Sequence, residues 1–269
     1  MTILVLAATG KTGRRLIPQL RADGNEVRAA SRSGEVRFDW TEPGTWAAVL
    51  AGVRAVYLVA PDETGPIEAF VEQAVRAGVE RFVVLSGRKL DQAGGRFGHG
   101  MLAAEQAVAA SGVGWTVLRS NNFNQNFDEY TWREPLLAGR LALPIGAMGE
   151  PFIDAQDVAD VAALALTGVG HFGQVYELTG PDSLPFADAV RMISEAIGRP
   201  IEYVEVPSAE YEAGLLAEGD PADVAESLAA MFEIMRSGLI TEPTDTVEKL
   251  LGRRATTFAE YTARAWSRA

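Results

Sequence analysis

The sequence predicts an α/β protein: a doubly wound parallel sheet with a smaller, mixed α/β part in the C-terminal half. Three features of the chain carry this prediction. An apolar run near the N-terminus leads through a glycine turn into a helical pattern, helical segments that end in glycine precede apolar runs four times, and this repeat stops beyond about Gly139. Strands and helices that alternate in this way form right-handed βαβ crossovers, so the strands lie parallel with helices on both faces.

The N-terminal stretch is typical of a strand, a tight turn and a helix start. Ile3–Leu6 is apolar enough for a strand buried on both faces, and helical periodicity begins just after Gly10. Backbone N–H groups and the positive end of a helix dipole converge at such a turn, so an anion such as a pyrophosphate can bind there. We expect Gly10 to let a dinucleotide approach the backbone and Gly13 to let the helix lie close to the strand. Because Ala7 replaces the usual first glycine, a glycine-containing turn of some other α/β protein is the alternative.

The same unit recurs along the first half of the chain. Glycine-terminated helical segments precede apolar runs that predict strands at 26–31, 55–59, 81–85 and 115–118. The C-terminal half predicts short strands at 141–144, 174–178 and 202–206, and helices at 154–167, 186–197 and 224–235. The last of these helices is rich in Met and Phe, and it either lines a substrate pocket or packs in the core. We expect residues 1–138 to form a dinucleotide-binding core and residues 139–269 a smaller substrate-binding part packed on it.

Composition limits the classes of protein. The 269 residues carry a formal net charge of −12, which disfavours nucleic acid and anionic membranes as partners. Without cysteine there can be no disulfide, thiolate nucleophile or iron–sulfur cluster. A zinc site would have to rely on carboxylates beside His99 and His171, and we expect no metal. The first apolar run is too short to span a bilayer, so we expect a cytoplasmic protein that is a monomer or a homodimer.

Ligands of a doubly wound sheet bind beyond the carboxyl ends of the strands, so the residues that follow each strand are informative. Arg32 follows the second strand, and a guanidinium there favours the 2′-phosphate of NADP(H), whereas the nearby Glu35 leaves NAD(H) open. Asp39 can cap the next helix or accept a hydrogen bond from an adenine amino group. Ser86 places a hydroxyl at the end of a later strand, and Asn122 belongs to a polar cluster after the last one.

These segments together resemble the NmrA-like group of atypical short-chain dehydrogenase/reductases. The resemblance covers roughly residues 1–207 and continues in the C-terminal half through 151–159 and 176–181. It implies a Rossmann-type fold in which Ser86 and Asn122 lie near the nicotinamide. The residues that it places against the dinucleotide are Thr9, Gly10, Lys11, Thr12, Gly13, Arg32, Asp39, Ala60 and Pro61.

The chain departs from this family in its chemistry. Short-chain reductases usually deliver a proton from a tyrosine whose pKa is lowered by a lysine four residues later, and no tyrosine lies between Ser86 and Ser111. His99, near the start of the helix in question, either donates a proton and positions the substrate or serves as a capping or surface residue. Ser86, without a base, either hydrogen-bonds the carboxamide or a substrate oxygen or caps a turn. Glu105 is expected on an exposed helix face.

Two classes of function follow from these residues. The first is an NADPH-dependent reductase that holds hydride donor and acceptor in line, with His99, water or the substrate as the proton source. Quinones suit such a site because their reduced oxyanion is comparatively stable, and an aromatic or polyketide-like substrate is the related possibility. The second class is a dinucleotide-reading regulatory protein without turnover, which the missing Tyr–Lys pair permits.

Overall fold

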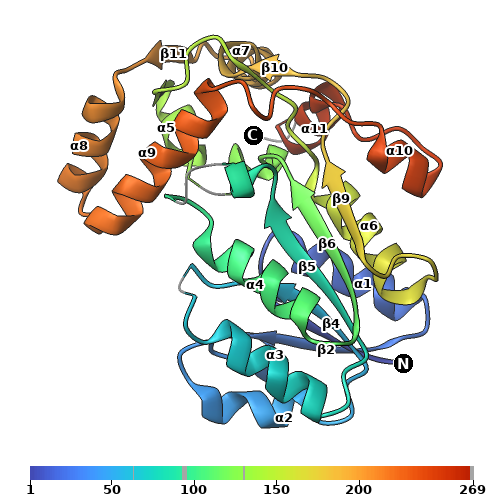
Figure 1. Ribbon diagram of the computed structural model, residues 1–269. Coiled ribbons are helices and arrows are strands. Elements are labelled where there is room, and N and C mark those ends of the chain that lie inside the picture. Colours follow the sequence, from blue (N-terminus) through green and yellow to red (C-terminus); the bar gives the residue numbers. More distant parts are fainter. Residues whose placement is uncertain (63, 93–95, 130, 267–269) are drawn as a thin grey trace. The chain divides into compact units, whose positions relative to one another are not determined.

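The computed structural model describes residues 1–62, 64–92, 96–129 and 131–266, and the chain divides into two compact units (Figure 1). The first, here the sheet unit, comprises Met1–Arg88, Gly98–Ser120 and Ala155–Leu178. The second unit comprises Lys89–Phe97, Asn121–Asp154 and Thr179–Ala269. This division differs from the single boundary expected after residue 138, because Ala155–Leu178 returns to the sheet.

The sheet unit contains the predicted doubly wound sheet. Among the described residues seven strands form one sheet in the order β3-β2-β1-β4-β5-β6-β9, and each neighbouring pair is parallel. From β1 the chain builds outward to β3 and then crosses back to β4 on the other side of β1. Doubly wound sheets bind their ligands at this switch point between β1 and β4. The strands are β1 (Thr2–Leu6), β2 (Glu26–Ser31), β3 (Val36–Arg37), β4 (Ala55–Val59), β5 (Arg81–Gly87), β6 (Gly114–Ser120) and β9 (Gln174–Leu178).

Helices cover both faces of this sheet (Figure 1). On one face α1 packs against α6, which also contacts β4, β5 and β6. On the other face α3 packs against α4 and α2, and the apolar side chains of these helices form one core with Val56, Phe82 and Val84 of the sheet. The fold class predicted from the sequence is therefore confirmed. The helices are α1 (Gly13–Ala22), α2 (Trp46–Leu50), α3 (Ile67–Arg76), α4 (His99–Ala110) and α6 (Ala155–Thr167).

The first turn of α4 lies directly on the loop that follows β4. A Cβ atom placed on Gly100 would lie only 1.7 Å from the carbonyl oxygen of Pro61 and 3.1 Å from that of Asp62. Real Cβ atoms do not approach carbonyl oxygens this closely, because atoms in protein interiors are already in van der Waals contact. Only glycine at this position lets the first turn of α4 pack this closely against the loop after β4.

The second unit has its own aromatic core. Phe127 packs against Phe152, Phe186 and Phe258, and Phe152 packs against Phe186 and Phe258, edge to face or tilted, with ring centroids at most 5.8 Å apart. On α9 (Ala222–Arg236) the Phe232 and Met235 side chains are buried in the same core, in agreement with the core-packing interpretation of this helix. The remaining elements are α5 (Arg133–Ala138), β7 (Arg140–Leu143), β8 (Gly149–Glu150), β10 (Leu184–Pro185), α7 (Phe186–Ile197), β11 (Glu202–Glu205), α8 (Ser208–Glu218), α10 (Thr246–Leu251) and α11 (Phe258–Ala265), with short 3₁₀ turns at Pro43–Thr45, Leu90–Gln92 and Asn124–Asn126.

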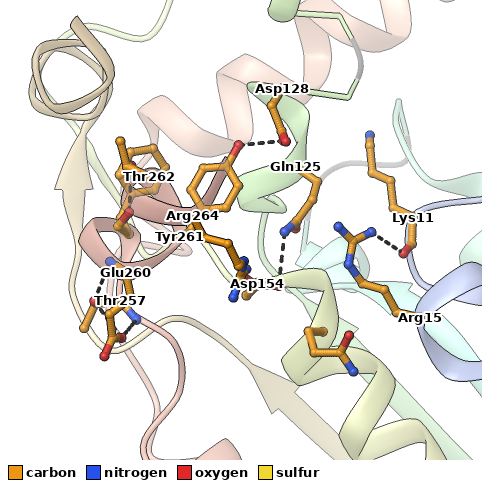
Figure 2. Close-up of polar contacts among 12 residues, drawn as sticks. Lys11, Arg15, Gln125, Asp128, Asp154, Thr257, Glu260, Tyr261, Thr262 and Arg264 are labelled. Atoms are coloured by element: carbon orange, nitrogen blue, oxygen red, sulfur yellow. Dashed lines mark hydrogen bonds and ion pairs between the residues drawn. The ribbon is translucent and has the colours of Figure 1, made fainter. Parts of the chain in front are cut away.

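Buried polar contacts connect α11 to the middle of the chain within the second unit (Figure 2). The fully buried carboxylate of Asp154 accepts hydrogen bonds from Gln125 Nε2, at 3.1 Å, and from the Arg264 guanidinium. The Tyr261 hydroxyl donates to Asp128 Oδ1 at 2.6 Å. Within the described part of the chain, none of the helices combines the length and the apolar character needed to cross a bilayer.

Candidate functional site

The turn between β1 and α1 is tight in spite of the alanine at its first position. Ala7 adopts a left-handed backbone conformation, with φ of 50°, and its carbonyl oxygen accepts a hydrogen bond from Gly10 N at 2.8 Å. This conformation costs an L-residue about 1 kcal/mol, which glycine at the same position would avoid. A Cβ atom on Gly13 would lie 2.4 Å from Ala7 O, so Gly13 is required for α1 to pack on the turn. The packing role predicted for Gly13 agrees with this geometry.

The start of α1 presents unused hydrogen-bond donors. The Arg14 and Leu16 amides donate to Gly10 O and Thr12 O, at 3.1 and 2.9 Å. Among the residues that the structure describes, the Thr12 and Gly13 amides have no acceptor. The N–H groups and the positive end of a ten-residue helix therefore meet at one place, where an anion is stabilised.

Cationic side chains flank the same turn. Lys11 lies within it, and the Arg15 guanidinium donates to Lys11 O at 2.8 Å from one turn further along α1 (Figure 2). A cavity of about 210 Å³ lies beside the turn, lined in part by Thr9, Arg14 and Gly34. Glu35 lines the same cavity, so both signs of charge are present there. In a chain with a net charge of −12, a phosphate site requires nearby cationic groups such as these.

A second set of donors follows β2. Arg32 is exposed, and the hydroxyl oxygen of Ser31 is buried with no hydrogen-bond partner among the described residues. A Cβ atom on Gly34 would lie 2.5 Å from that oxygen, so Gly34 packs directly against the hydroxyl. Glu35, which left NAD(H) open as a cofactor, forms an ion pair with Arg21 at 2.8 Å. The groups left at the end of β2 are a guanidinium and a hydroxyl.

Asp39 forms a local turn instead of capping a helix. Its Oδ1 accepts hydrogen bonds from Thr41 N at 2.9 Å and from Thr41 Oγ1 at 2.8 Å. These bonds, with smaller contributions from the charges of Arg32 and Arg37, lower the pKa of the Asp39 carboxyl below its usual value. The Pro43–Thr45 turn and α2 begin without a side-chain cap, so the capping interpretation of Asp39 was wrong. Its contact with adenine stays a prediction.

Ser86, at the carboxyl end of β5, donates its hydroxyl proton to Glu105 Oε1 across a distance of 2.5 Å. Glu105, on α4, also accepts from Arg119 of β6, through Nε at 3.0 and 3.2 Å and Nη2 at 2.6 Å. The expectation that Glu105 lies on an exposed helix face was wrong, because its side chain is 11% exposed. The burial of this carboxylate is compensated by the guanidinium and the hydroxyl that bind it.

The direction of this hydrogen bond limits what Ser86 can do. A serine hydroxyl has one proton and two lone pairs, and the proton is already given to Glu105. Ser86 can therefore accept a further hydrogen bond but has no proton to donate to a substrate oxygen. Of the roles considered from the sequence, acceptance from a carboxamide N–H is the one that this geometry permits.

The other predicted site residues occupy different positions. His99 is the first residue of α4 and is exposed, and because Gly98 is the N-cap the histidine does not cap the helix. Ala60 and Pro61 are partly exposed after β4, with Pro61 O against Gly100. The roles of these three residues as proton source and as contacts of the dinucleotide stay predictions.

Asn122 lies in the second unit, where its amide is engaged at both ends. Its Nδ2 and its backbone N–H donate to Glu150 Oε1, at 3.2 and 3.0 Å, and its Oδ1 accepts from Asn126 Nδ2 at 3.3 Å. Glu150 is itself buried, so this network is a polar core of the loop after β6. Whether Asn122 also contacts nicotinamide stays a prediction.

Two residues of the site escaped the sequence analysis or were misplaced by it. The hydroxyl of Tyr57, in the middle of β4, donates to Thr12 Oγ1 at 3.0 Å, and nothing local in an apolar strand indicates such a partner. Glu105 could have been found, because it shares a helical stripe with Ala104 and Val108, both fully buried. Among the described residues no group of three or more His, Asp or Glu side chains is placed to hold a metal ion.

Comparison with known proteins agrees with this geometry. A family model described as NAD(P)H-binding matches residues 7–168. The chain is 33% identical to the oxidoreductase YesF of Bacillus subtilis, over 97% of this chain and 94% of that one. It is 32% identical to an NAD(P)H azoreductase of Xenophilus azovorans, over 96% of both chains.

Solved structures share the whole fold at lower identity. The NADPH-dependent quinone oxidoreductase QOR2 of Escherichia coli superposes with a TM-score of 0.78 at 23% identity, covering 97% of this chain and 98% of that one. NmrA, a negative transcriptional regulator solved with NADP, gives 0.76 at 19% identity and covers 98% and 95%. The NmrA-like resemblance is confirmed, and so is the prediction of a nicotinamide dinucleotide as cofactor. The chain belongs to the NAD(P)H-binding oxidoreductase family.

Proposed function

We propose that this protein is an NADPH-dependent reductase of quinone-like or other electron-poor aromatic molecules. The observation that carries the cofactor assignment is the pair of donor sets in the sheet unit. Free amides at the start of α1 fit a pyrophosphate, and Arg32 with the unpartnered Ser31 hydroxyl fits a 2′-phosphate. The ion pair of Glu35 with Arg21 supports NADPH over NADH, since it removes the acid that would receive ribose hydroxyls.

The strand order supports a position for the nicotinamide. With the pyrophosphate at the start of α1, an adenosine half held by Arg32 after β2 would leave the nicotinamide half on the side of β4 and β5. Ser86 is the last residue but one of β5, which lies two strand spacings or about 10 Å from β1. There its oxygen can accept from the carboxamide N–H₂ and fix the orientation of the ring, while Ala60 and Pro61 line the intervening edge.

The residues present favour an acceptor that does not need a strong general acid. When bound, NADPH supplies a hydride to the substrate. Ser86 gives its proton to Glu105 and the Tyr–Lys pair is missing, so no side chain of β5 or of the described part of α4, other than the exposed His99, is equipped to protonate a nascent alkoxide. A quinone or a related conjugated molecule stabilises the negative charge in its own ring. The azoreductase and the quinone oxidoreductase among the relatives act on acceptors of this kind by name.

Titration with NADPH and NADH tests the cofactor assignment. Replacing Arg32 with Ala should weaken NADPH binding by about 10- to 100-fold, because a charge-assisted pair with the 2′-phosphate is lost, and should barely affect NADH. Arg37→Ala is the matched control, since Arg37 is an exposed arginine paired with Glu42. Equal losses for both cofactors in the Arg32 variant would contradict the assignment.

Turnover over a panel of acceptors tests the reaction. We expect NADPH oxidation with quinones and azo compounds and little with simple ketones. His99→Ala should leave NADPH affinity intact and change the pH dependence of the rate if His99 is the proton source. Firm NADPH binding without turnover of any acceptor would instead favour a dinucleotide-reading regulator, the function named for the structurally similar NmrA.

A further inference from the structure

Thr12 has a hydroxyl proton that no described residue accepts. Its side chain is 4% exposed and sits at the N-cap of α1, but it makes no capping hydrogen bond. The one hydrogen bond that its oxygen forms is received from Tyr57 at 3.0 Å. Because a hydroxyl has one donor and two acceptor sites, the proton of Thr12 remains available beside the unpaired amides of Thr12 and Gly13.

Tyr57 is a fixed donor in this arrangement. It is fully buried in the middle of β4, and burial raises the pKa of its hydroxyl above the usual value, so it keeps its proton throughout the physiological range. Its backbone is held by the sheet on both sides, because Tyr57 pairs with Val5 of β1 and with Val83 of β5. The phenol oxygen can hardly move away from Thr12 without disturbing the centre of the sheet.

We propose that Tyr57 is a positioning residue that makes the Thr12 hydroxyl a hydrogen-bond donor to the pyrophosphate bound at the start of α1. Because one lone pair of Thr12 Oγ1 is occupied by the Tyr57 hydroxyl, the Thr12 proton points away from Tyr57 and is left for another acceptor, at the same helix start as the free amides. A hydroxyl that accepts a hydrogen bond is also a stronger donor. Without the phenol, the Thr12 hydroxyl is free to turn and donate to a backbone carbonyl of its own turn. This inference rests on the proposed NADPH site.

The test is a double-mutant cycle on NADPH affinity in the full chain. Thr12→Val removes the donor and should raise the Kd by about 10-fold or more, as expected for a hydrogen bond to a charged group. Tyr57→Phe should raise it by about 3- to 10-fold with the circular dichroism spectrum retained. In the Thr12→Val background, Tyr57→Phe should have no further effect, because the hydroxyl that it orients is gone. Thr12→Ser should restore near-normal affinity and the dependence on Tyr57.

A spectroscopic measurement separates this role from simple packing. The ³¹P chemical shifts of the pyrophosphate of bound NADP⁺ should move in Tyr57→Phe and Thr12→Val alike, and they should not move in Tyr203→Phe. Tyr203 is the matched control because its buried hydroxyl has no partner among the described residues and lies in the second unit. If the phenylalanine variant does not fold, Tyr57→Leu is used in the same cycle.

The outcomes distinguish this inference from the proposed function. Normal affinity and unchanged ³¹P shifts in Tyr57→Phe, with weakened binding in Thr12→Val, would overturn the role of Tyr57 and leave the pyrophosphate site in place. Additive losses in the double variant would overturn it as well. Unchanged affinity in both Thr12→Val and Gly10→Val would instead remove the anion site from this turn, and the proposed cofactor site with it.

Discussion

Ser86 and Thr12 show how much of a site depends on the direction of single hydrogen bonds. Both are buried hydroxyls at the carboxyl edge of the sheet, yet Ser86 gives its proton to Glu105 whereas Thr12 receives one from Tyr57. One hydroxyl is left as an acceptor and the other as a donor. A nicotinamide dinucleotide offers the complementary groups, an amide N–H₂ at one end and anionic oxygens in the middle.

The acceptor state of Ser86 can be tested by replacing Glu105 with Gln. The amide oxygen should then accept from Arg119 and the amide N–H₂ should donate to Ser86, which frees the serine proton to point outward. Wild-type protein should bind NADPH about threefold or more tightly than reduced 3-acetylpyridine adenine dinucleotide phosphate, in which a methyl group replaces the amide N–H₂. In Glu105→Gln this ratio should fall to one or invert. The measurement is the ratio of the Kd of the analogue to the Kd of NADPH in the same variant. A general loss of stability affects both Kd values and cancels from their ratio.

Two further variants control the comparison. Ser86→Ala should remove the preference in both backgrounds, and Glu233→Gln, at an exposed ion pair with Arg96, should keep the wild-type ratio. A wild-type ratio that survives Ser86→Ala would show that the carboxamide does not contact this serine.

Single residues were predictable where backbone geometry demands a residue type. Gly13 follows from the close packing of a strand, a turn and a helix. Arg32 lies directly after β2, and its contact with a 2′-phosphate stays a prediction. Tyr57 was not predictable, because the partner of a buried phenol lies 45 residues away in the chain. Glu105 was misplaced because a charged residue in a helix is usually solvated, and its partner Arg119 lies on a different strand.

At the scale of elements, α4 depends on one glycine for its position. Its first turn lies on the carbonyl oxygens of the loop after β4, and Glu105 lies in the next turn of the helix, five residues after Gly100. The position at which Gly100 contacts the loop therefore determines the position of Glu105 relative to Ser86. The packing of α4 on the loop and the direction of the Ser86–Glu105 hydrogen bond are therefore coupled through the helix backbone.

Replacing Gly100 with Ala should lower the free energy of unfolding by about 1–3 kcal/mol, because a Cβ atom 1.7 Å from Pro61 O forces α4 away from the loop. Gly214→Ala is the matched control. Gly214 lies within α8, where an added Cβ atom would meet no atom within 4 Å, and alanine there should stabilise the protein by about 0.5–1 kcal/mol. Urea denaturation measures both changes. Equal free energies of unfolding for the Gly100 variant and the wild type would show that the loop rearranges to accept the Cβ atom without destabilising the protein.

The elements that the sequence predicted are those with strong periodicity and a glycine at the end. The strands β1, β2, β4, β5, β6 and β9 and the helices α1, α3, α6, α7 and α9 were predicted in this way, whereas the two-residue β3 was not. The helix α8 was missed because Gly214 interrupts it and its apolar residues do not form a stripe, and α10 is only six residues long. The helix α11 could have been found, since Thr257 and Glu260 form a capping box that the sequence displays.

At the scale of the whole molecule, the chain alternates between the two units. It leaves the sheet unit after Arg88, returns at Gly98, leaves again after Ser120 and returns at Ala155. The sequence analysis placed one boundary at residue 138, because the βαβ repeat stops there. Hydrophobic periodicity shows that 155–167 is a helix, but it does not show which surface that helix covers.

A chain that ends at residue 138 should therefore not fold. It lacks α6, which packs on α1 and on three strands, and β9, which pairs with β6. We expect no cooperative thermal transition by circular dichroism and no NADPH binding by fluorescence, in contrast to the full chain. Cooperative melting with normal NADPH affinity in this fragment would support the contiguous boundary.

The return of the chain to the sheet also causes a delay during synthesis, between the completion of β6 and the completion of the segments that cover it and pair with it. The segment that covers β4, β5 and β6 and the strand that pairs with β6 end at Leu178, 58 residues after β6 is finished at Ser120. At about 5–20 residues per second, a ribosome needs about 3–12 s to add them. For that interval the segments of the six strands up to β6 exist without the helix and the strand that complete their sheet. A chaperone that recognises exposed apolar strands has its opportunity to bind this protein in those seconds, before residue 178 is made.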